Sequence, residues 1–92
     1  MKIKITDIGL GLDKRTGVRT EKILARESFD AKDGLIMKVG PEAKIFKIVY
    51  LEKDRVDILL REDKIMTFYH GDKFNFYPLK REGSHYYIIE IR

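Results

Sequence analysis

The sequence predicts an all-β domain, a small antiparallel meander of about seven or eight short strands that forms a barrel or a two-sheet sandwich. Turn-forming groups rich in Gly and Asp recur at short, fairly even spacing along the 92 residues. Runs rich in Ile, Val, Phe and Tyr lie between them, and these runs alternate with a period of two. A chain of this length has room for one hydrophobic core, so residues 1–92 are expected to form a single domain.

The expected strands begin at residues 2–6, where Ile3 and Ile5 alternate with lysines. Groups such as DKRTG, DAKDG and REDK supply the residues that tight turns favour. The sharpest of these is HGDK at residues 70–73, which predicts a two-residue hairpin. The full set of expected strands is 2–6, 18–25, 35–39, 43–51, 55–60, 64–69, 73–77 and 85–91.

The segment 18–29 does not keep a single phase, because Val18 and Thr20 share a face that Ile23 does not. Two interpretations stay open. A β-bulge can shift the register of a strand, which is the interpretation we favour, or these residues form one short helix.

The expected strand 43–51 is apolar on both faces. One face contains Ile45 and Val49, and a sheet of this size has a core large enough to cover only one face of such a strand. We therefore expect the surplus face to bind a protein partner, with a homodimer as the favoured arrangement. The residues predicted to contact that partner are Phe46, Ile48 and Tyr50.

The composition restricts the class of protein. With 43% hydrophobic residues the chain is too apolar to be disordered, and without cysteine it has no disulfides or thiolate metal ligands. The start MKIKITDIGL lacks the uninterrupted apolar segment of a signal peptide, and the apolar run IFKIVYL is too short to span a bilayer. We expect a soluble protein of the cytoplasm that has no contact with a membrane.

The glycine-rich segment DIGLGLDKRTGVR does not fit a phosphate-binding loop. Five residues separate Gly11 from Gly17, whereas the Walker A motif has four residues between its glycines, and no Lys-Ser or Lys-Thr pair follows. We interpret these glycines as turn residues.

The two histidines, His70 and His85, are the groups suited to proton transfer or nitrogen ligation near neutral pH. With Asp72 they form a candidate two-histidine, one-carboxylate metal set. This is the weakest functional hypothesis, because the spacing of the histidines is not diagnostic and both fall at predicted turns. The acidic residues cluster at turns, which favour Asp for backbone hydrogen bonds. We expect no catalysis, no cofactor and no bound metal.

Seven of the ten aromatic residues lie between Phe68 and Tyr87. The phenylalanines alternate as core residues do, whereas tyrosines tolerate both burial and exposure. Exposed tyrosines beside basic residues are typical of small barrels that bind nucleic acids by stacking on bases and neutralising phosphates. The net charge of +4 is spread along the chain, and its densest basic segment is DKRTGVRTEK. The residues assigned to this alternative are Lys14, Arg15, Arg19, Tyr77 and Tyr86.

The function predicted first is therefore a non-catalytic binding domain that acts by protein–protein contact or self-association. Nucleic-acid binding is the alternative, and a small metal protein or enzyme based on the histidines is the third hypothesis.

Overall fold

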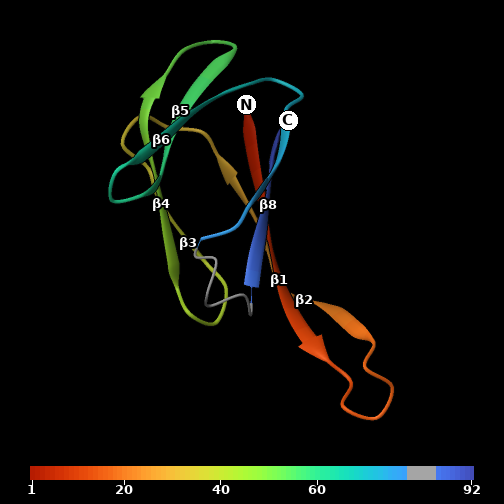
Figure 1. Cartoon of the computed structure of the whole chain (residues 1–92). Helices are drawn as coiled ribbons and strands as arrows, with labels where there is room; N and C mark the ends of the chain where they lie inside the picture. Colours follow the sequence, from red (N-terminus) through yellow and green to blue (C-terminus); the bar gives the residue numbers. More distant parts are fainter. Residues whose placement is uncertain (79–84) are drawn as a thin grey trace.

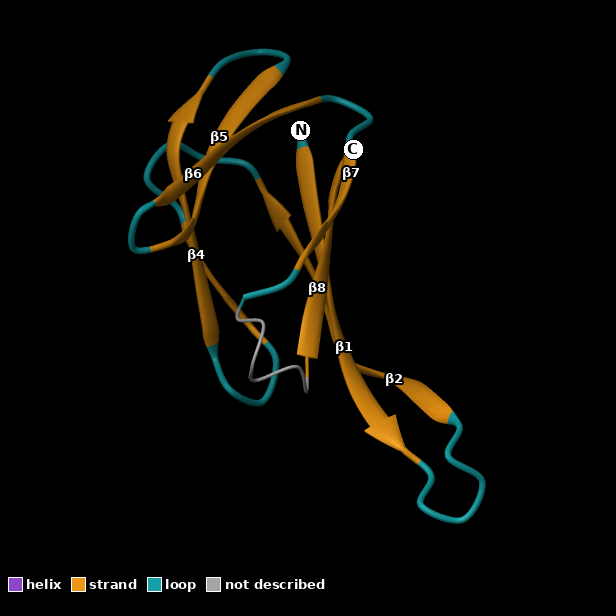
Figure 2. Ribbon diagram, viewed as in Figure 1, coloured by secondary structure: helices purple, strands orange, loops and turns teal. Residues whose placement is uncertain are grey.

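The computed structural model describes residues 1–78 and 85–92. All regular structure in these residues is β-strand, arranged as two four-stranded antiparallel sheets that pack as a sandwich (Figures 1 and 2). Sheet A has the strand order β2-β1-β8-β7, and sheet B has the order β3-β4-β5-β6. The strands are β1 (Lys2–Leu12), β2 (Arg19–Asp30), β3 (Ile36–Val39), β4 (Lys44–Leu51), β5 (Arg55–Arg61), β6 (Lys64–Tyr69), β7 (Lys73–Phe76) and β8 (His85–Ile91).

The all-β prediction is confirmed, and the two sheets form a sandwich that does not close into a barrel. Sheet B is a simple meander of four consecutive strands. Sheet A combines both ends of the sequence, because β1 pairs with β8 from Ile3 opposite Ile91 to Gly9 opposite His85. The two chain ends therefore lie side by side (Figure 1), with Lys2 and Arg92 exchanging backbone hydrogen bonds of 2.6 and 2.7 Å.

The core lies between the sheets and follows the alternation of the sequence. Inward positions of β1 and β8 from sheet A face inward positions of β4 and β5 from sheet B. Three aromatic rings pack at its centre, where the ring of Phe46 meets those of Phe76 and Tyr87 edge to face at 6.1 and 5.4 Å. Alternate residues of short strands thus supply a shared apolar interior. The buried cluster consists of Ile3, Ile5, Met37, Val39, Phe46, Ile48, Val56, Ile58, Leu60, Phe68, Phe76, Tyr87, Ile89 and Ile91.

The predicted hairpin at residues 70–73 is wrong, because β6 and β7 belong to different sheets. The turn itself is tight. Gly71 has a φ of 93°, the Asp72 N–H donates to the Tyr69 carbonyl at 3.0 Å, and the Asp72 carboxylate accepts the Tyr69 N–H at 2.8 Å. This tight turn therefore connects β6 of sheet B to β7 of sheet A and does not close a hairpin.

The segment 18–29 is a strand with a bulge, and the helical interpretation is wrong. Asp7 pairs with Ala25, and the next residue, Ile8, pairs with Ile23, so Leu24 is the extra residue. The phase change in the sequence marks this bulge.

The partner face assigned to residues 43–51 is wrong for two of its three residues. Phe46 and Ile48 are fully buried in the core, whereas Ile45, which lies on the opposite face, is 50% exposed. Tyr50 is 43% exposed because a second bulge lies between Ile48 and Tyr50 and turns its side chain outward. The predicted alternation therefore holds only as far as Ile48, with inner and outer faces exchanged, and the bulge breaks it before Tyr50.

The described residues contain no helix long and apolar enough to cross a membrane.

We predict that Phe46→Ala lowers the free energy of unfolding by about 3–5 kcal/mol, because it removes a fully buried ring from the centre of the core. The neighbouring substitution Ile45→Ala is the matched control, and it should change stability by about 0.5 kcal/mol or less because Ile45 faces solvent. Urea unfolding followed by far-UV circular dichroism measures both variants. A greater loss for Ile45→Ala than for Phe46→Ala would contradict this assignment of faces.

Candidate functional site

The end of the β1–β2 ribbon projects from the sandwich as an arm (Figures 1 and 2). We define the arm as residues 8–23, from Ile8, which pairs with Ile23, to the turn between Leu12 and Arg19. The arm accounts for the elongated shape of the molecule, which measures 49 × 24 × 19 Å.

The tip of the arm is ordered by Asp13. The Asp13 carboxylate accepts the Arg15 N–H at 2.8 Å, its carbonyl accepts the Gly17 N–H at 2.7 Å, and its own N–H donates to the Val18 carbonyl at 2.9 Å. Gly17 has a φ of 70°, a conformation that glycine adopts without a steric penalty. The tip is therefore a defined turn that presents Lys14 and Arg15 to solvent.

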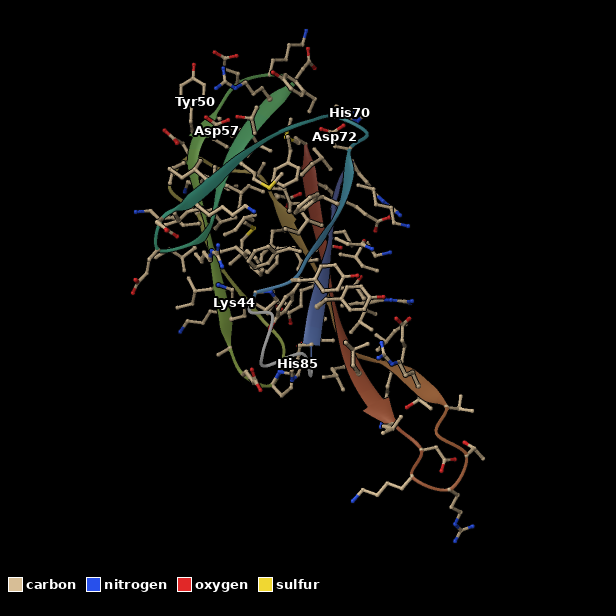
Figure 3. The ribbon with its side chains drawn as sticks, viewed as in Figure 1. Lys44, Tyr50, Asp57, His70, Asp72 and His85 are labelled. Atoms are coloured by element: carbon tan, nitrogen blue, oxygen red, sulfur yellow. The ribbon has the colours of Figure 1, made fainter. Side chains whose placement is uncertain are left out.

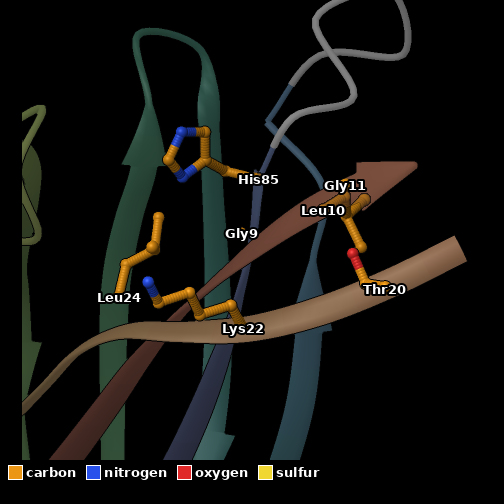
Figure 4. A pocket seen from close by; sticks show the side chains of 7 residues that line it. All are labelled: Gly9, Leu10, Gly11, Thr20, Lys22, Leu24 and His85. Atoms are coloured by element: carbon orange, nitrogen blue, oxygen red, sulfur yellow. The ribbon is translucent and has the colours of Figure 1, made fainter. Parts of the chain in front are cut away.

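The other glycines of this segment lie inside β1, so their interpretation as turn residues is wrong. Glycine is required at both positions because side chains of β2 occupy the space that a Cβ atom would take. A Cβ atom on Gly9 would lie 2.9 Å from Leu24 Cδ1, and one on Gly11 would lie 2.7 Å from Thr20 Oγ1. The absence of side chains at Gly9 and Gly11 leaves an open hollow of about 330 Å³ beside them (Figure 4). Its lining residues are Gly9, Leu10, Gly11, Thr20, Lys22, Leu24 and His85.

The other face of the arm continues the outer face of sheet A and carries apolar side chains beside Arg19 and Glu21. Alternation from Ile8 places Leu10 and Leu12 on this face, and the β1–β2 and β1–β8 registers add Ile23 and Tyr86. The exposed fractions of Leu12 and Ile23 are 61% and 48%. We call this surface the outer patch, and its residues are Ile8, Leu10, Leu12, Ile23, Tyr77 and Tyr86.

Two tyrosines form the inner end of the outer patch. The Tyr77 and Tyr86 rings stack on each other with centroids 5.1 Å apart and planes 22° apart. Tyr86 is buried and its hydroxyl donates to Glu21 Oε1 at 3.2 Å, so burial and this hydrogen bond raise the pKa of the Tyr86 phenol. Of these two stacked rings, Tyr77 is the one that presents an open face to solvent.

His85 sits at the base of the arm between two carboxylates. Its Nδ1 atom lies 3.0 Å from Asp7 Oδ1, and its Nε2 atom lies 3.3 Å from Glu42 Oε1. The hydrogen bond with Asp7 raises the pKa of His85 most, burial opposes this, and the charges of Asp7 and Glu42 raise it further. The two carboxylates therefore favour the protonated form of the imidazole over its ordinary balance, and His85 links β1, β8 and the β3–β4 turn.

The Asp7 carboxylate is fully enclosed at this corner. Its Oδ2 atom has no hydrogen-bond partner among the described residues, and it would lie 2.1 Å from a Cβ atom on Gly40. Gly40 also has a φ of 79°, so any side chain there would be strained and would displace the carboxylate. Burial, together with the charges of Asp7 and Glu42, raises the pKa of the neighbouring Tyr87 to about 12.

This corner has a structural use that follows from its charges. Both ring nitrogens of His85 lie within contact distance of carboxylate oxygens, so neither is free to take a proton from another molecule. The His85 side chain fixes the arm to the body instead. Asp7 directly precedes the arm, and Gly9, the second residue of the arm, pairs with His85.

The proposed metal set is not assembled. His85 is at the first residue of β8, whereas the turn of His70 and Asp72 contacts the last one, where the Gly71 N–H donates to the Ile91 carbonyl at 2.8 Å. Six residues of strand separate these ends, which is roughly 20 Å, and Figure 3 shows the two histidines far apart. No group of three or more metal-ligating side chains occurs in residues 1–78 and 85–92.

The residues assigned to nucleic-acid binding are only partly brought together. Lys14, Arg15 and Arg19 lie at the far end of the arm, and Tyr77 lies at its base on the same outer face as Arg19. Asp7 and Glu42 were not predicted from the sequence. The signal for Asp7 was present, since it is a charged residue at the inward position that follows Ile3 and Ile5.

Comparisons of the chain with protein-family models, curated proteins and solved structures find no match.

We predict that the stability of the protein decreases as the pH rises above the ordinary histidine pKa of about 6.5, because the folded-state pKa of His85 is raised. The stabilisation by the His85 cation is complete below the unfolded-state pKa of about 6.5 and is lost as the pH rises through the folded-state value. Urea unfolding at each pH measures this slope. His85→Gln should make the slope shallower, because glutamine does not carry the charge that the two carboxylates stabilise. Equal slopes for the wild type and His85→Gln would refute the assignment.

Proposed function

We propose that the protein is a non-catalytic assembly domain that acts through protein–protein contact, with a second copy of the chain as its first partner. The observation that carries this proposal is the arm, a two-stranded ribbon that projects from the sandwich with large apolar side chains in solvent. Exposed apolar patches on a soluble domain mark binding surfaces more often than chance allows.

The arm gains little stability by itself. Isolated two-stranded ribbons are marginal in water, and this one lacks a covering layer on both of its faces. Its exposed apolar residues are Leu10, Leu12, Val18 and Ile23, and because each is about half exposed, burial by a partner contributes about 0.7–1.5 kcal/mol for each. In the free protein these exposed apolar side chains are unfavourable in water, and their burial against a partner offsets that unfavourable free energy.

A second copy suits the arm because the free edge of β2 is itself a binding element. β2 has twelve residues, and within the described part of the chain its ladder partner is β1 alone. The opposite edge presents unpaired backbone N–H and C=O groups, which pair readily with another strand. An antiparallel strand pair can be symmetric, so the same edge can serve on both copies.

Catalysis is not part of this proposal, since the His85 imidazolium is held by two carboxylates and serves as an anchor. The proposal also places the domain in the cytoplasm, because it has none of the cysteines that stabilise many secreted domains of this size.

We predict a reversible monomer–dimer equilibrium that depends on the arm. Replacing residues 10–21 by Asn-Gly leaves Gly9 and Lys22, an observed cross-strand pair, joined by a favoured two-residue turn. This variant should keep the sandwich but dimerise at least about tenfold more weakly, because it loses Arg19, Thr20 and Glu21 from the β2 edge together with the exposed apolar residues Leu10, Leu12 and Val18. Sedimentation equilibrium over a range of concentrations measures the change.

Ile65→Lys is the matched control, because Ile65 is an equally exposed apolar residue on the outer face of sheet B. It should leave the dimerisation constant unchanged. A wild-type protein that remains monomeric at the highest soluble concentration would overturn self-association, and an arm-shortened variant that dimerises like the wild type would remove the arm from the interface.

Nucleic-acid binding is the second candidate function, favoured by the basic tip of the arm and by the position of Tyr77 on the same face as Arg19. Under this alternative, fluorescence anisotropy with a labelled single strand should show binding at low salt that weakens steeply as salt increases. The variant Arg15→Ala should reduce the affinity for all sequences alike. An absence of binding at low salt would end this alternative.

A further inference from the structure

The free edge of β2 carries a charge pattern that complements itself. We infer that two copies of the chain pair through their β2 edges, antiparallel, about a two-fold axis that passes between Leu24 and Ala25. The two copies of sheet A then form one continuous eight-stranded sheet. This inference rests on the proposed self-association and specifies its surface, its register and its partner.

The bulge at Leu24 makes this symmetry possible. Directly opposite residues of an antiparallel pair point to the same face, and a two-fold axis normal to the sheet keeps every residue on its own face. If the axis passes midway between two neighbouring residues of a regular strand, the residues that it brings opposite each other point to different faces of the sheet. A regular strand therefore cannot pair with itself about such an axis. One extra residue at the axis reverses that phase.

The observed faces of β2 agree with this requirement. Pairing with β1 places one set of side chains on the outer face of sheet A and the other set on the inner face. Each set has members on both sides of the bulge, at equal distances from it. The outer set is Arg19, Glu21, Ile23, Arg26, Ser28 and Asp30, and the inner set is Thr20, Lys22, Ala25, Glu27 and Phe29.

In this register opposite charges meet. Lys22 of one copy lies opposite Glu27 of the other on the inner face, and Arg19 lies opposite Asp30 on the outer face. Because of the two-fold symmetry each pair occurs twice, which gives four cross-strand pairs of opposite charge. The remaining pairs, such as Thr20 with Phe29, contain no like charges.

Neighbouring registers lose this complementarity. A shift of two residues in one direction leaves a single kind of opposite-charge pair, Glu21 with Arg26. The same shift in the other direction opposes Glu21 and Asp30, which repel each other. The charge pattern therefore selects the register that the bulge permits.

This arrangement also covers the arm. Residues 19–23 of β2 belong to the arm and residues 25–30 belong to the body, so each arm lies along the body of the other copy. The Lys22–Glu27 contacts fall on the inner face, where Lys22 also lines the hollow beside His85. The two arms thus cross-link the dimer in a symmetric manner, and the outer patches of both copies become parts of one face.

The test is a charge exchange between Lys22 and Glu27, both of which are exposed. Lys22→Glu and Glu27→Lys each replace two attractive contacts by two repulsive ones, so each variant alone should dimerise about tenfold or more weakly than the wild type. A 1:1 mixture of the two single variants restores every contact in the heterodimer. The double variant K22E/E27K restores every contact in the homodimer, and both should dimerise within about threefold of the wild type.

The measurements are sedimentation equilibrium and native mass spectrometry at low ionic strength, where screening is weak. Lys47→Glu on the exposed outer face of sheet B is the control and should have no effect on dimerisation. Wild-type dimers that are indifferent to the charge exchange would refute the β2 register but leave self-association intact. A strictly monomeric wild type would refute both, and it would assign the bulge and charges of β2 the role of preventing edge-to-edge pairing.

Discussion

The pairing of β1 with its two neighbours is the constraint on which the rest of the molecule depends. Ile3 and Ile5 on the inner face of β1 complete the core, Asp7 anchors the corner with His85, and the same strand then leaves the body as one half of the arm. A single alternating strand thus passes from apolar interior, through a buried charge, to a projecting ribbon. Each later feature requires the correct register of the preceding one.

The buried Asp7 carboxylate marks the boundary between body and arm. Enclosing a charged group is costly unless an opposite charge and hydrogen bonds compensate; His85 in its protonated form supplies the opposite charge and one hydrogen bond to Oδ1, while Oδ2 has no partner among the described residues. Gly40 lets the β3–β4 turn approach the carboxylate closely, while Glu42 from that turn contacts the other side of the imidazole. The position of the arm is therefore fixed by a specific polar contact at the point where apolar packing ends.

Much of this fold was predictable from the sequence, because alternation and turn residues depend on local chemistry. All eight strands occur in the expected order, and the phase change near Lys22 correctly marks a bulge. The choice of sheet and of inner face was not predictable, since it depends on contacts between distant strands. For that reason Phe46 and Ile48 were assigned outward, and the turn before β7 was read as a hairpin. The His85 corner requires β1, β8 and the β3–β4 turn to meet, and no local pattern indicates that.

The union of the two chain ends in sheet A has a kinetic consequence. Contacts between β1 and β8 join residues 76 to 88 positions apart, and the entropy of closing so long a loop must be overcome before those contacts form. Sheet B, whose strands are consecutive, can form earlier through local hairpins. We therefore expect folding to be slow for so short a chain, with completion of sheet A as its late step and refolding dominated by topology.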